Sequence, residues 1–310
     1  MHTLPYNDYG HAMRQRFGGR VQKLAIDAGL SCPNRDGSIG YGGCTFCLNE
    51  AFSPSYCRTQ PSITEQIEAA IKFHTSRGRT ADSYIAYFQA GTNTHAPLLK
   101  LKDIYSEALS HPHVSGLIIG TRPDCISSEI LDYLEELSHD KYIAIEYGIE
   151  SIYDTTLQHV NRGHNFATAR EAIATTRARG IETGAHFILG LPGESEQMIL
   201  DSIAIINTLG INTVKFHQLQ IYRGTVIERD YSSHPENYLF NKEYKAERYA
   251  ELLCNILRRL DPSIAVERFV SQAPRHLISH SPLGGIRPDS IRNMVVDLMH
   301  SLGAKQGDML

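Results

Sequence analysis

The chain has 310 residues, of which 42% are hydrophobic and 21% are charged, and its formal net charge at pH 7 is −4. This is the composition of a globular protein long enough for one α/β-barrel-sized domain, and the lack of any apolar run of about eighteen residues excludes a helical membrane span. The negative balance argues against a dominant electrostatic attraction to nucleic acid, although a local basic rim is compatible with it. Residues 1–19 lack the apolar segment of a secretory signal. We therefore expect a cytoplasmic protein in a reducing compartment, where clustered cysteines favour metal or redox chemistry.

Short apolar runs alternate with longer amphipathic patterns along most of the chain, which is typical of βαβ units and a parallel sheet. Six such units are two short of a closed (β/α)8 ring. The sequence therefore predicts an α/β fold, a partial (β/α)6 TIM-like barrel with a wide lateral mouth. The strands are expected over residues 21–27, 84–89, 114–120, 142–148, 183–190 and 213–220, and the helices over 63–77, 97–110, 127–138, 166–179, 194–209 and 241–260.

The two ends of the chain are expected to extend this barrel. Residues 1–20 form an N-terminal extension, 21–260 form the barrel, and 261–310 form a short C-terminal extension that packs on it. This last part contains a predicted strand at 265–270 and a predicted helix at 288–302. It is too short for a second enzyme domain, so we expect it to close one edge or the bottom of the barrel.

A glycine-rich stretch after the first strand, LSCPNRDGSIGYGGCTFCLN, carries Cys32, Cys44 and Cys47 in the pattern C-x11-C-x2-C. In barrels of this kind the active site is built at the carboxyl ends of the strands, where this stretch lies. Three thiolates can hold an iron–sulfur cluster and leave one iron free for another ligand. A structural zinc site needs four protein ligands, and Cys57 or a histidine could complete that set. The spacing leaves both interpretations open.

The cysteine pattern is accompanied by further motifs, AGTNTHAP, GTRPDCI, EYGIESIYDTTLQHVNRGH, HFILGLPGE and VKFHQLQIYRGT. Together they resemble the radical S-adenosylmethionine (SAM) superfamily and, within it, the YhcC-like family. That family is related to the radical SAM part of the elongator catalytic subunit and to oxygen-independent coproporphyrinogen oxidase. The resemblance spans residues 6–269. The first cysteine gap is longer than the superfamily's commonest C-x3-C-x2-C and agrees with YhcC-like and elongator-type members.

This resemblance implies a radical SAM enzyme. Cys32, Cys44 and Cys47 would bind a 4Fe–4S cluster, and S-adenosyl-L-methionine would chelate its fourth iron, which leaves Cys57 as a spare cysteine. Reductive cleavage of the sulfonium then gives methionine and a 5′-deoxyadenosyl radical that abstracts hydrogen from a substrate. The electron would come from an external donor such as flavodoxin or ferredoxin. RNA and a small metabolite both stay open as substrates.

The resemblance also implies a SAM site on the loops after the second and third strands. GTNT lies where the superfamily receives the ammonium group of SAM on backbone carbonyls. There Gly91 would permit close approach, and Thr92 and Asn93 could add hydrogen bonds, although such a segment is also a common polar turn. Arg122 either pairs with Asp124 or reaches a ligand carboxylate.

Four further residues, on the fourth and fifth strands or in the stretch between them, are candidates for the same site. A carboxylate on an apolar strand is costly without a partner, so Glu146 would bind the ammonium or ribose of SAM, or a nearby arginine. Glu150 matches a glutamine that contacts SAM in coproporphyrinogen oxidase. Arg162 matches the arginine that pairs with the SAM carboxylate there, a structural ion pair being the alternative. His186 matches a ribose-binding aspartate and is either a ligand contact or a satisfied core histidine.

Two other classes of function compete with the radical enzyme. One is a non-catalytic cluster or haem-binding chaperone on the same fold, and the other is a zinc-stabilised barrel. A basic excess near the N-terminus leaves RNA binding at the barrel mouth open, with solvated surface charge as the ordinary alternative. Its members are Arg14, Arg16, Arg20, Lys23, Arg35 and Arg58.

Overall fold

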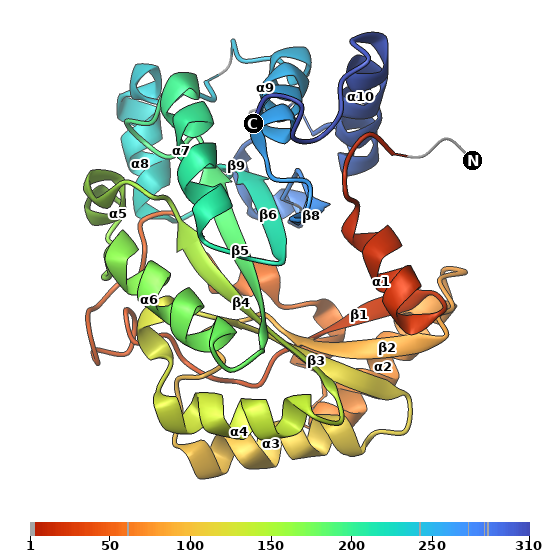
Figure 1. Cartoon of the computed structure of the whole chain (residues 1–310). Coiled ribbons are helices and arrows are strands. Elements are labelled where there is room, and N and C mark those ends of the chain that lie inside the picture. Colours follow the sequence, from red (N-terminus) through yellow and green to blue (C-terminus); the bar gives the residue numbers. More distant parts are fainter. Residues whose placement is uncertain (1–3, 61, 242, 272, 282, 284) are drawn as a thin grey trace.

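The computed structural model describes residues 4–60, 62–241, 243–271, 273–281, 283 and 285–310. Within these residues one sheet of seven parallel strands, in the order β1-β2-β3-β4-β5-β6-β8, curls into a partial barrel (Figure 1). The predicted fold class is confirmed, and the stretch predicted at 265–270 adds the seventh strand. The strands are β1 (Val21–Ile26), β2 (Ser83–Phe88), β3 (Val114–Thr121), β4 (Tyr142–Glu150), β5 (Glu182–Leu189), β6 (Thr213–Gln218) and β8 (Ala265–Arg268).

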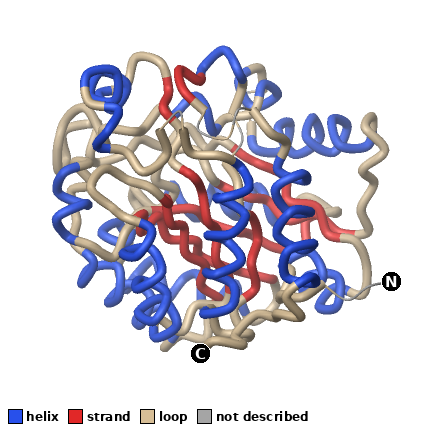
Figure 2. Tube along the Cα trace, turned by 90° about the horizontal axis from the view of Figure 1, so that it is seen from above, coloured by secondary structure: helices blue, strands red, loops and turns tan. Residues whose placement is uncertain are grey.

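Helices follow the strands and surround the sheet, as Figure 2 shows. Their starts follow the local sequence: Ser62 and Glu65 form a capping box on α2, and the Ser127 hydroxyl accepts a hydrogen bond from the backbone N–H of Ile130 at the start of α4. The helices between consecutive strands are α2 (Ile63–Thr75), α3 (Leu98–Ser110), α4 (Ser128–Ser138), α6 (Phe166–Arg177), α7 (Glu196–Thr208) and α9 (Ala246–Arg259).

The remaining elements lie outside this strand–helix alternation. They are α1 (Tyr9–Phe17), α5 (Asp154–His159), α8 (Val226–Ser233) and α10 (Pro288–Ser301), the short 3-10 helices η1 (Asn49–Phe52), η2 (Ser55–Arg58), η3 (Pro123–Cys125), η4 (Pro235–Asn237) and η5 (Arg275–Leu277), and a two-stranded antiparallel sheet of β7 (Ile221–Tyr222) and β9 (Ile278–His280). None of the described helices is both long and apolar enough to cross a membrane.

The start of the last barrel helix differs from the prediction. The expected helix over 241–260 begins only at Ala246. The apolar residues before it, Tyr238, Phe240 and Tyr244, are buried as a loop, with the rings of Phe240 and Tyr244 packed edge to face. The first described residues of the predicted helix therefore belong to a loop whose aromatic side chains help to fill the core. The proposed division of the chain at residue 260 stays a prediction.

The core has a large outer layer and a small inner one. Side chains such as Leu24, Phe88 and Phe216 are fully buried in the large layer, and burial of each contributes about 1.5–3 kcal/mol. Inside the barrel, Met13 of α1 packs with Ile85 and neighbouring residues of the strands. The rest of the barrel interior is left for polar groups.

Candidate active site

The loop between β1 and α2, residues 27–60, is called the cysteine loop below. Its first part is shaped by glycines that adopt positive φ. At Gly43 φ is +78°, and a Cβ there would lie 2.7 Å from Nε of Arg35. Asp36 organises the turn by accepting hydrogen bonds from the backbone N–H and hydroxyl of Ser38. Glycine is therefore required where the chain folds back toward Cys44.

Cys32, Cys44 and Cys47 line one cavity of about 250 Å³ at the carboxyl ends of the strands, which we call the reaction cavity. Burial and the nearby thiols raise the pKa of Cys47 to about 12, so a thiolate at this position needs a compensating cation. Two donors already point at Cys44 Sγ: Arg162 Nη1 at 3.5 Å and Asn34 Nδ2 at 3.8 Å. A thiolate ligand fits this donor set.

The described residues contain no group of three His, Cys, Asp or Glu side chains arranged to hold a single metal ion. In a four-iron cluster each thiolate binds a different iron, so the three sulfurs need not converge on one point. Cys57 lies elsewhere, on η2, where its buried thiol donates to the carbonyl of Ala25 at 3.4 Å. The geometry fits a three-cysteine cluster site with Cys57 outside it.

Most of the predicted SAM-binding residues line the reaction cavity. Asn93 is the exception: its backbone N–H and its side-chain Nδ2 both donate to the Gly120 carbonyl. Asn93 joins the ends of β2 and β3, and a contact to SAM stays a prediction. The candidates that do line the cavity are Gly91, Thr92, Arg122, Glu146, Glu150, Arg162 and His186.

Gly91 holds the loop after β2 against the cysteine loop. Its φ is +75°, and a Cβ would lie 2.3 Å from the carbonyl oxygen of Leu30. Its N–H donates to Oδ1 of Asn49, also in the cysteine loop, at 3.1 Å. Only glycine fits this approach of two backbones. A close approach of SAM to Gly91 stays a prediction.

Two buried arginines face the cavity with unused donors. Arg122 binds Asp124 through Nε at 2.9 Å and Nη2 at 2.7 Å. Arg162 lies 3.6 Å from the Glu150 carboxylate. Arg122 Nη1 and Arg162 Nε have no hydrogen-bond partner among the described residues. An unpaired buried donor costs about 1–3 kcal/mol, so a ligand with oxygen acceptors would stabilise this arrangement.

Glu150 itself has an unusual environment. Its φ is +74°, rare for a residue other than glycine, and the β4–β5 register shifts beside it. Burial raises the pKa of its carboxyl group, against the opposing charges of Arg162 and Arg122. Backbone strain of this kind costs about 1–3 kcal/mol and is concentrated at functional sites.

Comparison with known proteins settles the family. The Radical SAM superfamily model matches residues 34–206, and the model of the radical SAM C-terminal domain matches residues 211–299. The chain belongs to the radical SAM superfamily. It is 32% identical over 99% of its length to YtqA of Bacillus subtilis, covering 91% of that protein, and 34% identical over 87% of its length to YhcC of Escherichia coli, covering 84%. These matches confirm the family predicted from the sequence motifs, and the chain is a radical SAM enzyme.

A solved structure with the same fold is that of Elp3 from the archaeon Methanocaldococcus infernus with an N-terminal deletion. The TM-score is 0.66 at 18% identity, over 92% of this chain and 64% of that one. The chain thus spans about two thirds of the Elp3 structure. At this identity the likeness concerns the fold alone.

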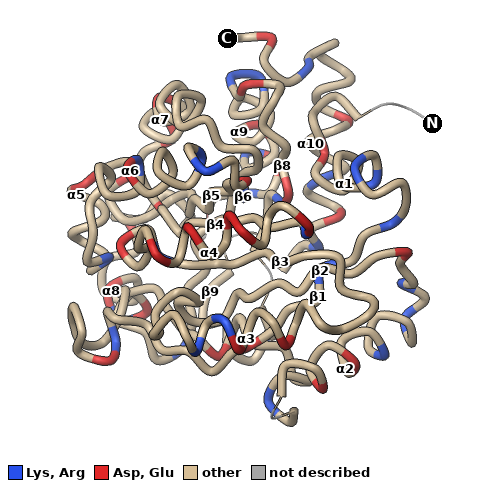
Figure 3. The backbone as a smooth tube through the Cα atoms, turned by 60° about the horizontal axis from the view of Figure 1, so that its bottom comes forward, with Lys and Arg blue, Asp and Glu red and all other residues tan. Residues whose placement is uncertain are grey.

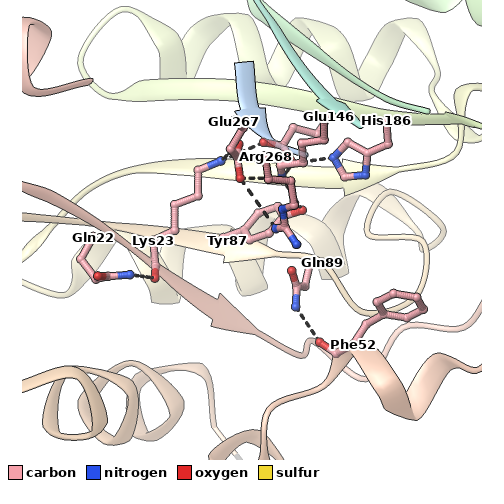
Figure 4. Close-up of polar contacts among 10 residues, drawn as sticks. Gln22, Lys23, Phe52, Tyr87, Gln89, Glu146, His186, Glu267 and Arg268 are labelled. Carbon is pink, nitrogen blue, oxygen red and sulfur yellow. Dashed lines mark hydrogen bonds and ion pairs between the residues drawn. The ribbon is translucent and has the colours of Figure 1, made fainter. Parts of the chain in front are cut away.

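Deeper in the barrel of this radical SAM enzyme lies a network of buried charges, which we call the ionic network (Figure 4). Glu146 binds Lys23 at 3.0 Å through one oxygen, and Lys215 and His186 through the other, the latter at 2.9 Å. Glu267 of β8 binds both lysines, Lys215 at 3.1 Å. Glu146, the carboxylate that was predicted to need a partner, therefore has three protein partners, and two of them are lysines, one from β1 and one from β6.

Electrostatics keep the ionic network charged. Burial opposes ionisation of Glu146, but the charges of Lys215 and Lys23 hold the pKa of that carboxyl well below its usual range. Burial lowers the pKa of Lys215 to about 8, against the pull of Glu146 and Glu267. Burial and the Lys215 charge lower the pKa of His186, so its ring is neutral and donates from Nε2 to Glu146. Glu146 is thus paired with three protein side chains, and His186 bonds Glu146 while it lines the reaction cavity. A contact of either residue to SAM stays a prediction.

Several residues of the site were not predicted as site residues from the sequence. Each is a charged or amide group in or just after a predicted strand, and only the curvature of the sheet brings them together. A lysine in VQKLAID and a Glu-Arg pair in AVERFV were the available signals, because charges in buried strands need partners. The missed residues are Asn34, Lys23, Lys215, Glu267 and Arg268.

Proposed function

We propose that this chain binds one 4Fe–4S cluster through Cys32, Cys44 and Cys47 and one S-adenosyl-L-methionine beside it. The observation that carries this proposal is that three thiols and two buried arginines with unused donors, Arg122 and Arg162, share one cavity of about 250 Å³. A cluster would bind the three thiols, and a SAM molecule beside it would supply acceptors for the arginine donors that have no partner in the protein. The family supports the same cofactors.

When bound, the cluster supplies the electron that cleaves the sulfonium of SAM to methionine and a 5′-deoxyadenosyl radical. The protein residues would orient the cosubstrate. Arg162 and Arg122 suit its carboxylate, because a guanidinium presents two parallel donors to a carboxylate. Glu150, raised in pKa by burial, and the loop at Gly91 suit its ammonium group. Arg162 and Asn34 would also stabilise thiolate charge at Cys44.

The partners in this proposal are an external one-electron donor such as flavodoxin or ferredoxin in the cytoplasm, and a substrate with a C–H bond held next to the reaction cavity. RNA and a small metabolite are the two substrate classes. The cavity that holds SAM is small, so either substrate would approach it from an adjoining space.

Anaerobic incubation of the reconstituted protein with dithionite and SAM tests the proposal. We expect 5′-deoxyadenosine, about four irons per chain, and loss of both in Cys47→Ala. A fully loaded protein that forms no 5′-deoxyadenosine contradicts the catalytic proposal, and iron retention in Cys47→Ala contradicts the ligand set. Cys57→Ala is the matched control, because this thiol is bonded to Ala25 outside the cavity.

A further inference from the structure

The open side of the barrel holds a second, larger cavity. It has a volume of about 1290 Å³ and lies between the edge strands β1 and β8, with residues 270–271, 273–275 and 285–288 along one side. We call it the lateral groove. It adjoins the reaction cavity, because six residues line both: Tyr87, Gln89, Gln218, Gln220, Arg268 and Ser271.

The lateral groove is basic although the chain is acidic. Among its described lining residues, Lys23, Arg268, Arg275 and Arg287 are cationic and Glu267 alone is anionic, which is four positive charges minus one, or +3. The whole chain has a net charge of −4, and Figure 3 shows basic and acidic residues interspersed along the backbone. The excess is therefore local to the groove.

The three arginines differ from Lys23, which is paired inside the ionic network. Arg268 lies 3.8 Å from Glu267, and its side chain keeps 35% of its exposure. Arg275 and Arg287 are exposed and form no ion pair with any residue that the structure describes. All three belong to the C-terminal segment beside the groove. Arg275 and Arg287, which have no carboxylate partner among the described residues, and Arg268, whose one ion pair is long, are available for an anionic ligand.

The opposite side of the groove is lined by His74, at the end of α2, and by the half-buried rings of Tyr56 and Phe73. Burial and the charges of nearby arginines lower the pKa of His74, so its ring is neutral and adds no charge to the groove. The guanidinium of Arg77 lies over the Phe73 ring, 3.6 Å from its centroid, which leaves Tyr56 as the aromatic side chain open to a ligand on this side.

We propose that the lateral groove binds a phosphate-bearing substrate, with Arg268 holding the phosphate next to the reaction cavity and Arg275 and Arg287 holding further phosphates outside it. This inference rests on the proposed function, since it takes the groove as the substrate's route to the reaction cavity. Arginine matches phosphate with two parallel donors, and several separated arginines suit a ligand with several negative charges. The half-buried ring of Tyr56, which lines the groove, suits contact with a base. A mononucleotide and a single-stranded polynucleotide share this chemistry.

Binding is measured on the full chain, reconstituted with iron and sulfide, without reductant or SAM. The probe is a fluorescent single-stranded oligoribonucleotide followed by anisotropy, with adenosine 5′-monophosphate and inorganic pyrophosphate as competitors. We expect the probe to bind, and the triple variant Arg268→Gln, Arg275→Gln, Arg287→Gln to lose about tenfold or more in affinity. The slope of log affinity against log salt should fall by about 0.7 for each arginine removed. The matched control is Arg170→Gln, Arg177→Gln, Arg229→Gln, which removes three exposed arginines outside both cavities.

Competition by the small anions at concentrations similar to those of the oligomer supports a mononucleotide-sized substrate, and competition only by excess oligomer supports a polynucleotide. Absence of binding by all probes up to about 1 mM overturns the inference, as does an equal loss in the control variant. Because no radical is formed in this assay, it separates the inference from the proposed function. Probe binding together with an absence of 5′-deoxyadenosine in the radical assay contradicts the proposed function alone.

Discussion

The barrel interior holds two groups of buried charge that differ in how completely they are paired. In the ionic network, Glu146, Lys215 and Lys23 satisfy one another together with Glu267. At the carboxyl ends of the strands, Arg122 and Arg162 each keep a buried nitrogen without a partner among the described residues.

This difference distinguishes residues that stabilise the fold from residues that are available to a ligand, although both kinds line the same cavity. A paired buried network is costly to break, because removing one member leaves its partners uncompensated. A buried donor without a partner is a cost that a ligand removes. Glu146 lines the reaction cavity but belongs to the first group, whereas Arg122 and Arg162 belong to the second.

The largest effect is expected where the paired group is broken. In Lys215→Met the carboxylates of Glu146 and Glu267 lose a buried cation, so the free energy of unfolding should fall by about 3–5 kcal/mol. Urea denaturation measures this, with the exposed Lys100→Met as the control. Adding Glu146→Gln to Lys215→Met should recover part of the loss. A single variant as stable as the control contradicts the assignment of the network as structural.

Gly91→Ala tests the contact between the loop after β2 and the cysteine loop. A methyl group would meet the Leu30 carbonyl at 2.3 Å, and the positive φ alone costs about 1–2 kcal/mol. We expect unfolding free energy to fall by more than about 2 kcal/mol and iron content to drop after reconstitution. Gly78→Ala has a similar φ of +68° with no heavy atom within 4 Å, so it isolates the backbone cost. Equal losses in the two variants would show that the close approach is unimportant.

Arg122→Lys tests whether the unpaired donor serves SAM. The lysine keeps the charge next to Asp124 but loses the guanidinium fork, so the dissociation constant for SAM should rise about tenfold with little change in stability. Equilibrium dialysis of reconstituted protein measures it. Arg179→Lys is the matched control, since Arg179 binds Asp132 through the same two nitrogens away from the cavity. Unchanged SAM affinity in Arg122→Lys contradicts the assignment.

The pH dependence of stability tests the neutral histidines beside the ionic network. Burial, with the positive charges of Arg268 and Lys215, lowers the pKa of His217 well below its usual range. Below about pH 6.5 the unfolded chain takes up a proton at His217 that the folded chain does not, so stability falls as pH falls. The slope from this residue is about 1.4 kcal/mol per pH unit. Urea denaturation between pH 5 and 7 should give a smaller slope for His217→Asn than for the wild-type protein, and equal slopes contradict it.

The sequence predicts the elements of this protein better than it predicts the partners of its charges. Strand and helix periods locate all six repeated units because each depends on neighbours a few residues away. The cysteine spacing and Gly91 likewise report local demands. Glu146 is recognisable as a carboxylate that needs a partner, but Lys23 and Lys215 become its partners only when β1 and β6 curl toward each other. Asn93 was predicted as a residue that contacts a ligand. In the structure its side chain donates to the Gly120 carbonyl and so joins the ends of two strands, a role that depends on a residue far along the chain.

The smallest effect is expected at Cys57, which differs from the other three cysteines of its loop in the partner of its thiol. Its thiol is paired with the Ala25 carbonyl, whereas the thiols of Cys32, Cys44 and Cys47 face a common cavity. Burial raises the pKa of both Cys57 and Cys47 to about 12, so their positions and not their pKa values distinguish them: Cys57 lies outside the cavity that Cys47 lines. Cys57→Ala should lower the free energy of unfolding by only about 1 kcal/mol, the effect of losing one small buried group, and should leave iron and sulfide content unchanged. Loss of iron in this variant would place Cys57 among the ligands and would return a four-cysteine metal site to consideration.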